Sequence, residues 1–235
     1  MLKRTVLILV AGLVMLAAAP SAYAQQTLNF SIGYFTIRGE DARVDNDVLL
    51  ENRNFLVFDF KDFHGPAVGA EWLIPIGNWI EAGAGASFYR RTVGTVYEDF
   101  THADDTEIEQ DLRLRVIPVA FTVRVLPLGQ ESGVQPYFGG GLGVFAWRYS
   151  ESGEFVDLTT LAIFREQYVA SGNATGPIAL GGIRFAGDSV SAGVEARYQG
   201  ADAELGRPFS SGLADPHIDL GGWTYQATIG IRFGR

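Results

Sequence analysis

Apolar and polar residues alternate along eight separate stretches of this chain. Near the C-terminus, for example, Trp223, Tyr225 and Ala227 fall on one face while Thr224 and Gln226 fall on the other. A period of two is the signature of a β-strand whose faces meet different surroundings. The predicted strands span 27–35, 66–76, 79–89, 114–126, 135–149, 175–185, 190–198 and 218–233. The sixth is apolar on both faces, so the pattern does not orient it.

The connections between these strands alternate in length. Short ones cover 76–78, 127–134 and 186–189, and long ones cover 36–65, 90–113, 150–174 and 199–217. Strands of about 9–11 residues cross a bilayer at a tilt, and short turns on one side with long loops on the other are typical of barrels in the bacterial outer membrane. We therefore expect 27–35 to close against 218–233 as an antiparallel pair, because lipid offers an open edge no partners.

The polar face indicates which side of the barrel meets lipid. It consists of Gly, Ser and Thr with a few charges, which is too small to coat a soluble exterior but fits a narrow lumen. The sequence therefore predicts an all-β, eight-stranded, antiparallel up-and-down transmembrane barrel with short periplasmic turns and long extracellular loops. The residues expected to face lipid include Ile80, Ala82, Phe121, Val123, Val194, Ile229 and Ile231. The residues expected in two aromatic girdles are Trp72, Trp79, Tyr137 and Phe233 near the turns, and Tyr34, Tyr89, Trp147 and Tyr198 near the loops.

The N-terminus has the features of a secretory signal peptide. Lys3 and Arg4 precede an apolar run, and the small-residue site Ala22-Tyr23-Ala24 follows it. We expect cleavage after Ala24, export to the bacterial outer membrane, and one barrel domain spanning 25–235.

Net charge argues against nucleic-acid binding, and the cysteine count excludes disulfides. Removing Lys3 and Arg4 from a formal net charge of −9 leaves −11, which disfavours nucleic-acid binding. The chain has no cysteine and so no disulfides. We predict no cofactor and no metal. The acidic stretch 97–111 offers carboxylates for a divalent cation but lacks the spacing of a calcium loop.

Two stretches resemble a known family. The segments "VQPYFGGGLGVFAWRY" (134–149) and "GWTYQATIGIRF" (222–233) resemble strands of the small eight-stranded outer-membrane β-barrel superfamily, of the OmpA-transmembrane-domain, OmpX and OmpW kind. The resemblance implies an architecture rather than one activity. It also implies outer-membrane lipids, including lipopolysaccharide, as surroundings, and the barrel-insertion machinery as a partner during assembly. Family barrels commonly finish on an aromatic residue, whereas here Gly234 and Arg235 follow Phe233.

Several charged residues fall on the predicted lumen face: Glu71, Glu81, Arg124, Glu195, Arg197 and Arg232. Glu71, Glu81 and Arg124 occupy neighbouring strands, so we expect them to meet. One interpretation is an ion-paired plug, and the alternative is a polar conduction path. Eight strands leave room for little beyond side chains, which favours the plug.

A basic cluster is predicted where the strands leave the membrane outward. Its members are Arg38, Lys61, Arg90, Arg91, Arg113, Arg115 and Arg148. Arginine suits bidentate phosphate contacts, so these residues are candidates for contacting lipopolysaccharide. The alternative is pairing with the acidic loops.

The loops carry further candidates. Alternation continues in 55–63 and 111–115, which predicts a protruding sheet whose edge offers a protein partner a site for strand addition. The apolar stretch 158–169 is interpreted as a short lid or a continued strand. His64, His102 and His217 all lie on the loop side, without a His-x-Ser pattern and with His217–Asp219 as the closest local pair.

The sequence thus predicts a non-enzymatic outer-membrane barrel with a structural or surface-interaction role. The alternative is a narrow channel for small or hydrophobic solutes, in the manner of OmpW. A lipid A-modifying enzyme is the third reading.

Overall fold

A computed structural model describes residues 25–206, 209 and 215–234. The predicted signal peptide, residues 1–24, lies outside these described residues. Within them, no helix is long and apolar enough to cross a membrane.

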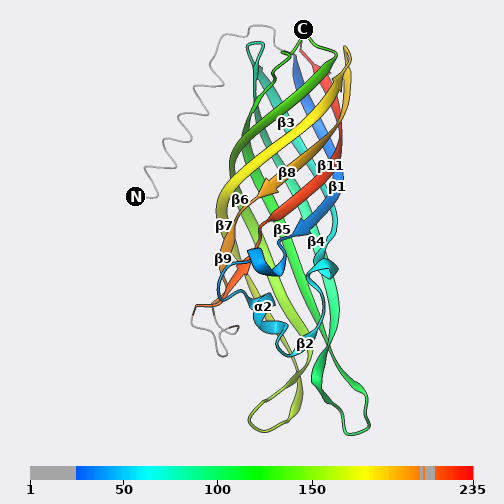
Figure 1. Ribbon diagram of the computed structural model, residues 1–235, viewed down its shortest axis with the longest axis vertical. Helices are drawn as coiled ribbons and strands as arrows, with labels where there is room; N and C mark the ends of the chain where they lie inside the picture. Colours follow the sequence, from blue (N-terminus) through cyan, green and yellow to red (C-terminus); the bar gives the residue numbers. More distant parts are fainter. Residues whose placement is uncertain (1–24, 207–208, 210–214, 235) are drawn as a thin grey trace.

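Eight long strands form a closed antiparallel ring, drawn in Figure 1 as a tall cylinder. They are β1 (Gln26–Ile37), β3 (Gly65–Ile76), β4 (Ile80–Thr101), β5 (Glu107–Val125), β6 (Val134–Val156), β7 (Ile163–Ala186), β8 (Val190–Gln199) and β11 (Gly222–Phe233). The seam between β1 and β11 runs from Gln26 opposite Phe233 to Ile37 opposite Gly222. This pairing confirms the predicted closure and the predicted count of eight barrel strands.

Four of the strands are much longer than the pattern predicted. The four strands β4 to β7 contain 22, 19, 23 and 24 residues, and their two hairpins extend beyond the barrel at the end opposite the start of β1 and the end of β11 (Figure 1). Most of 90–113 and 150–174, predicted as loops, is therefore strand. The stretch 158–169 is a turn followed from Ile163 by β7, so of its two interpretations the continued strand is correct.

The predicted strand over 55–63 is wrong. Only β2 (Leu56–Val57) is extended there, and the 3-10 helix η2 (Phe60–Phe63) follows. Asp59 caps η2 by accepting from the backbone N–H of Lys61, and Phe60 and Phe63 are both buried. Apolar residues three apart suit one face of a helical turn as well as they suit a strand, and the cap decides between them.

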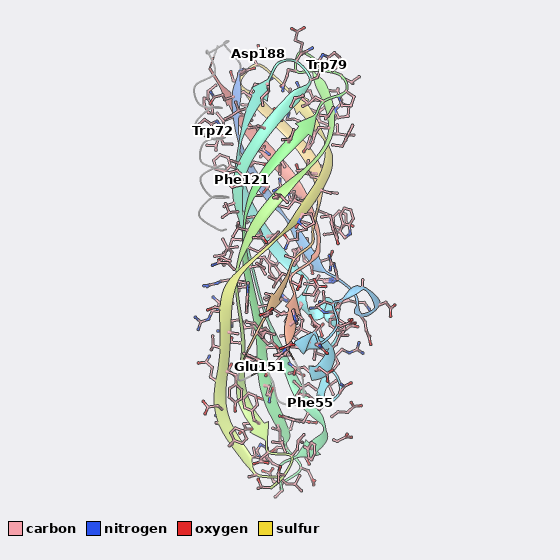
Figure 2. The ribbon with its side chains drawn as sticks, turned by 90° about the vertical axis from the view of Figure 1, so that its left-hand side faces the viewer. Phe55, Trp72, Trp79, Phe121, Glu151 and Asp188 are labelled. Atoms are coloured by element: carbon pink, nitrogen blue, oxygen red, sulfur yellow. The ribbon has the colours of Figure 1, made fainter. Side chains whose placement is uncertain are left out.

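The two faces of the barrel wall separate as the alternation predicted. Along β5, even-numbered residues from Ile108 to Arg124 are buried and odd-numbered ones face outward. Of the residues predicted to meet lipid, Ala82 is half-buried and the other six are 40–61% exposed. Figure 2 shows Trp72, Trp79 and Phe121 in the half of the molecule nearer the turns. The barrel exterior is thus an apolar band, which a bilayer covers.

The prediction of two aromatic girdles is correct for five residues and wrong for three. Trp72, Trp79, Phe233, Tyr34 and Tyr198 lie on the exterior, where Tyr198 packs against Trp223 with ring centroids 5.2 Å apart. The remaining three residues, Tyr89, Tyr137 and Trp147, are 3–5% exposed and face inward. In the alternation of their strands these three residues share the inward face with the glycines. That face determines where a side chain points, even for an aromatic residue near a strand end.

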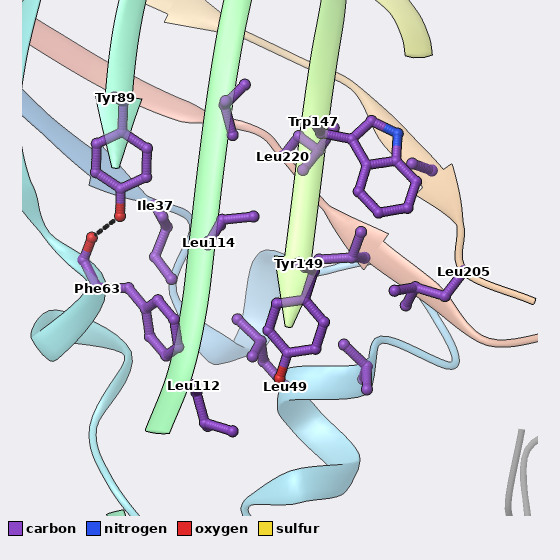
Figure 3. Close-up of a cluster of buried hydrophobic side chains, with 14 of the residues drawn as sticks. Ile37, Leu49, Phe63, Tyr89, Leu112, Leu114, Trp147, Tyr149, Leu205 and Leu220 are labelled. Carbon is purple, nitrogen blue, oxygen red and sulfur yellow. Dashed lines mark hydrogen bonds between the residues drawn. The ribbon is translucent and has the colours of Figure 1, made fainter. Parts of the chain in front are cut away.

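The loop end of the barrel is closed by a hydrophobic core. The segment after β1 carries the 3-10 helix η1 (Glu40–Ala42) and the helix α2 (Val48–Asn52). Two short strands, β9 (Asp202–Glu204) and β10 (His217–Asp219), pair with each other, and β10 lies beside this segment. Leu49, Phe63 and Tyr149 are fully buried where these segments meet the strands (Figure 3). The loop segments therefore pack together over this end of the barrel, and we call this packed layer the roof.

Candidate functional site: the lumen and the outer rim

The middle of the lumen holds four charged side chains of alternating sign. Arg124 on β5 contacts Glu71 on β3 and lies 3.0 Å (Nη2 to Oε2) from Glu195 on β8. Arg197 completes the set, with Nη2 2.9 Å from Glu71 Oε2 and Nε 2.9 Å from Glu195 Oε1. Each carboxylate thus meets two guanidinium groups, and Arg124 is only 1% exposed.

Neutral side chains occupy the remaining positions around this cluster. Thr122 Oγ1 donates to Glu71 over 2.9 Å, and Gln226 Nε2 donates to Glu195 over 2.8 Å. Tyr137 donates its hydroxyl to Glu195 over 3.1 Å, and its ring lies 4.8 Å from the guanidinium carbon of Arg124. Buried charges are tolerated when such partners satisfy them, and within the cluster Arg124 Nε alone lacks a hydrogen-bond partner among the described residues. The four charged side chains therefore form one connected unit.

A second ion pair lies nearer the turns. Glu81 is opposite Arg124 in the β4–β5 register, yet it bonds to Arg184 of β7 in a bidentate pair with N–O distances of 3.0 and 3.2 Å. Gln135 accepts a further bond from Arg184 over 2.9 Å. The expected meeting of Glu81 with Arg124 is replaced by this pair. Arg232 stands apart at the turn end, half-buried, and donates to the carbonyl of Gly187.

A small cavity lies beside the charged cluster. The cavity beside Glu71, lined also by Asn29, Ser31 and Ser87, measures about 20 Å³. That volume holds about one water molecule. The wall is equally tight, because a Cβ on Gly83 would lie 2.6 Å from Glu71 Oε1. The ion-paired cluster thus lies across the lumen, and the hydrophobic core of the loop end lies beyond it.

The roof contains a buried carboxyl group. Glu151 accepts hydrogen bonds from Asn52 Nδ2 over 2.6 Å and from the Tyr149 hydroxyl over 2.9 Å, and no ion pair reaches it within the described part of the chain. Burial raises the pKa of the Glu151 carboxyl above its ordinary value and raises the pKa of the Tyr149 hydroxyl as well. The contact ties α2 to β6.

Three of the predicted basic residues form a row on the outer surface. Arg90 on β4 is opposite Arg115 on β5, which in turn is opposite Arg148 on β6. Arg113 lies two residues along β5 and donates to Thr92 over 3.0 Å. Across residues 25–206 and 215–234, none of these four arginines forms an ion pair, and Arg115 Nε is buried without a partner. We call Arg90, Arg115 and Arg148 the arginine row.

The other predicted basic residues belong to the loops. Arg38 pairs with Asp219 over 2.9 Å, and Lys61 lies 3.5 Å from Asp59. Arg91 donates to the Asp62 carbonyl over 2.7 Å. For Arg38 and Lys61, pairing with loop acids is therefore what the structure shows.

The histidines make contacts among the outer segments. His102 lies 2.9 Å from Glu154, and this contact together with Arg165 holds the pKa of the Glu154 carboxyl below its usual value. His217 pairs with Asp202 over 3.3 Å rather than with Asp219. Among the described residues, no hydrogen bond joins a histidine to a serine hydroxyl, and no group of His, Asp and Glu is arranged to hold a metal. The acidic segment 97–111 is part of the β4–β5 hairpin.

Comparison with known proteins returns matches at the level of structure. No protein-family model matches the sequence, and no curated protein matches it. Solved structures similar to this chain include Ail, the attachment invasion locus protein of Yersinia pestis (12% identity, 89% of this chain and 99% of that chain, TM-score 0.43). They also include the N-terminal β-barrel domain of Pseudomonas aeruginosa OprF (11%, 89% and 99%, 0.38) and Neisserial surface protein A (10%, 89% and 97%, 0.44). One Ail structure contains the heparin analogue sucrose octasulfate.

These proteins are what the chain is similar to. The eight-stranded ring rests on its own strand pairing, and the apolar exterior on its own side chains. The closed ring and the apolar exterior together make the chain a small β-barrel of the outer-membrane type.

Proposed function

We propose that this protein is a non-enzymatic barrel of the bacterial outer membrane with a structural or surface-interaction role. The observation that carries the proposal is the filled lumen, in which Arg124 and Arg197 hold Glu71 and Glu195 under a packed roof. Export by the predicted signal peptide, residues 1–24, and assembly by the barrel-insertion machinery are part of the proposal. The parts free to interact are then the hairpins and the outer rim.

Conductance separates this role from the alternative, a narrow channel for small or hydrophobic solutes. Purified full-length barrel in planar lipid bilayers is expected to show no reproducible steps, because the four ion-paired side chains lie across the lumen. An open porin in the same bilayers shows that the recording detects conduction. Stable, reproducible steps from the wild-type protein would place the channel first.

A second proposal is that the arginine row contacts lipopolysaccharide. Like charges directly opposite one another on neighbouring strands destabilise a sheet, so three arginines in register favour an anion between them. Guanidinium groups bind phosphate oxygens in bidentate geometry. Phe88, two residues before Arg90 on the same face of β4, is 43% exposed on the barrel exterior. The row therefore lies where lipid-facing residues end, at the height proposed for lipopolysaccharide phosphates.

Replacing the row tests this contact. In the variant with Arg90, Arg115 and Arg148 changed to Gln, we expect the stabilisation that lipopolysaccharide gives the wild-type barrel in mixed bilayers to be lost. The control changes Lys61 and Arg165, exposed cations that already have acidic partners, to Gln. Unfolding midpoints with and without lipopolysaccharide provide the measurement. Equal stabilisation of wild type and row variant would remove the proposal.

A further inference from the structure

A polar cleft lies on the outer surface where β9 leaves the barrel wall. Gly200 N still donates to Pro177 O over 3.0 Å, but β9 then pairs with β10, and no strand pairing joins it to β7 within the described chain. The cleft measures about 370 Å³. One wall comes from β7 and the other from β9 and β10, and Trp147 of β6 lies at its floor.

The two walls of the cleft carry different polar groups. On β7, Ser171 and Asn173 are exposed and offer a hydroxyl and an amide. On β9, Asp202 and Glu204 are exposed, whereas Ala203 between them is buried in the hydrophobic core. The period of two along β9 thus directs both carboxylates outward, where they line the cleft.

The charge of the two carboxylates is only partly balanced. His217 Nδ1 lies 3.3 Å from Asp202 Oδ2, and Glu204 forms no ion pair within the described residues. Arg148 lies on β6 opposite Ser171, one strand further from these acids, and pairs with neither of them there. The cleft therefore keeps a negative potential, which favours a cationic ligand.

The floor of the cleft carries an unpaired hydrogen-bond donor. Trp147, which belongs to the buried cluster of Figure 3, is 4% exposed, and its Nε1–H has no acceptor among the described residues. A Cβ on Gly172 would lie 3.3 Å from this nitrogen, so the indole lies directly beside the β7 backbone at the cleft. A buried N–H without an acceptor is costly, and a ligand that brings an oxygen atom to it is favoured.

These groups suit an organic cation better than a metal ion. A calcium ion needs several oxygen ligands at about 2.5 Å, and no group of His, Asp and Glu among the described residues is arranged to hold a metal. An N–H donor also points its positive end at the ligand. The occupant must therefore offer an acceptor atom as well as a positive charge, and the volume admits a molecule that carries both.

We propose that this cleft binds a small hydroxylated amine of the amino-sugar class. The ammonium group lies between Asp202 and Glu204, and one hydroxyl oxygen accepts from Trp147 Nε1. Further hydroxyl groups pair with Ser171 and Asn173. The site is separate from the lumen cluster and from the arginine row, so it adds a ligand-binding role to the structural one.

The test uses the full-length barrel, isotope-labelled and placed in lipid nanodiscs, with glucosamine as the probe. Glucosamine is expected to shift the indole N–H resonance of Trp147, which is identified by its loss in Trp147→Phe. N-Acetylglucosamine and glucose keep the hydroxyl groups but lack the ammonium group, and each is expected to bind at least about tenfold more weakly. Added salt should weaken glucosamine binding, because the carboxylates are exposed.

Variants locate the contact on the protein. Glu204→Gln is expected to weaken glucosamine binding severalfold, because one of the two carboxylates is lost. Trp147→Phe removes the indole donor and is expected to weaken binding about fivefold. The matched control is Glu107→Gln, which changes an exposed acid on the β4–β5 hairpin and is expected to have no effect.

Three results would overturn the inference. They are equal binding of glucosamine and N-acetylglucosamine, an unchanged affinity in Glu204→Gln, and glucosamine-induced shifts that leave the Trp147 resonance in place. Glu204 is exposed, so its replacement is expected to leave the barrel folded. A negative result here leaves the conductance and lipopolysaccharide tests unaffected, and the proposed function would stand without this site.

Discussion

Removing either buried arginine of the lumen should destabilise the barrel, and Arg184→Leu should cost more than Arg124→Leu. Arg124 contacts two carboxylates, Glu71 and Glu195, so a count of ion pairs predicts the opposite order. Arg197 remains within 2.9 Å of both carboxylates when Arg124 is gone. Loss of Arg184 instead leaves Glu81 without its only ion-pair partner in the described structure.

The expected losses in unfolding free energy follow from how deeply each carboxylate is buried and from the cations that remain beside it. Breaking a buried ion pair by removing one partner costs about 3–5 kcal/mol, because the other charge stays buried and uncompensated. Glu81 is 2% exposed, so Arg184→Leu should reach the upper part of that range. Arg124→Leu should fall at its lower end, at about 3 kcal/mol, since Arg197 continues to offset part of the charge.

Urea unfolding of the refolded barrels in lipid vesicles, followed by far-ultraviolet circular dichroism, measures both values. Two double variants serve as matched controls. Glu81→Gln should recover most of the loss in the Arg184→Leu background, and Glu71→Gln should recover part of it with Arg124→Leu. If Arg124→Leu proves costlier than Arg184→Leu, Arg197 does not compensate the carboxylates and the description of the cluster as one unit is wrong.

Three other changes test the wall and the roof. Val194→Arg places a charge at a lipid-facing site that is 61% exposed, and should cost about 2–4 kcal/mol in vesicle folding titrations; a harmless substitution would contradict the side assignment. Gly141→Ala puts a Cβ 1.9 Å from a backbone oxygen and should cost about 1–3 kcal/mol, whereas Gly94→Ala meets nothing closer than 3.7 Å and should stay within about 0.5 kcal/mol. Because burial raises the pKa of Glu151, the folded state holds the proton more tightly than the unfolded chain, and stability contributed by this group grows as pH falls from above the raised pKa toward 4.5. Glu151→Gln should flatten that dependence and raise the urea midpoint at neutral pH, and an unchanged pH profile would exclude Glu151 as its source.

The barrel itself could be predicted because its pattern is local. Alternation in each strand is imposed by the two faces of one wall, and a shift by one residue would move Val123 into the lumen and Arg124 into lipid. The strand ends were less predictable. Above the membrane both faces of the hairpins meet water or the roof core, so polar residues such as Arg113 and Glu109 interrupt the apolar pattern without ending β5.

The lumen contacts could be predicted only in part: the expected contact of Glu71 with Arg124 is present although β3 and β5 are not adjacent, and the expected contact of Glu81 with Arg124 is not. Glu81 and Arg124 do face one another in register, but a tilted strand lets side chains cross a narrow lumen, and the partner of Glu81 comes from β7 on the far wall. Arg184 was missed because 175–185 is apolar on both faces. Its place opposite Gln135 in the β6–β7 pair is the signal that could have found it, since the inward parity of β6 also orients β7. In a closed barrel, a strand with clear alternation therefore shows which residues of its neighbour point inward. The alternation does not show which side chains meet across the lumen.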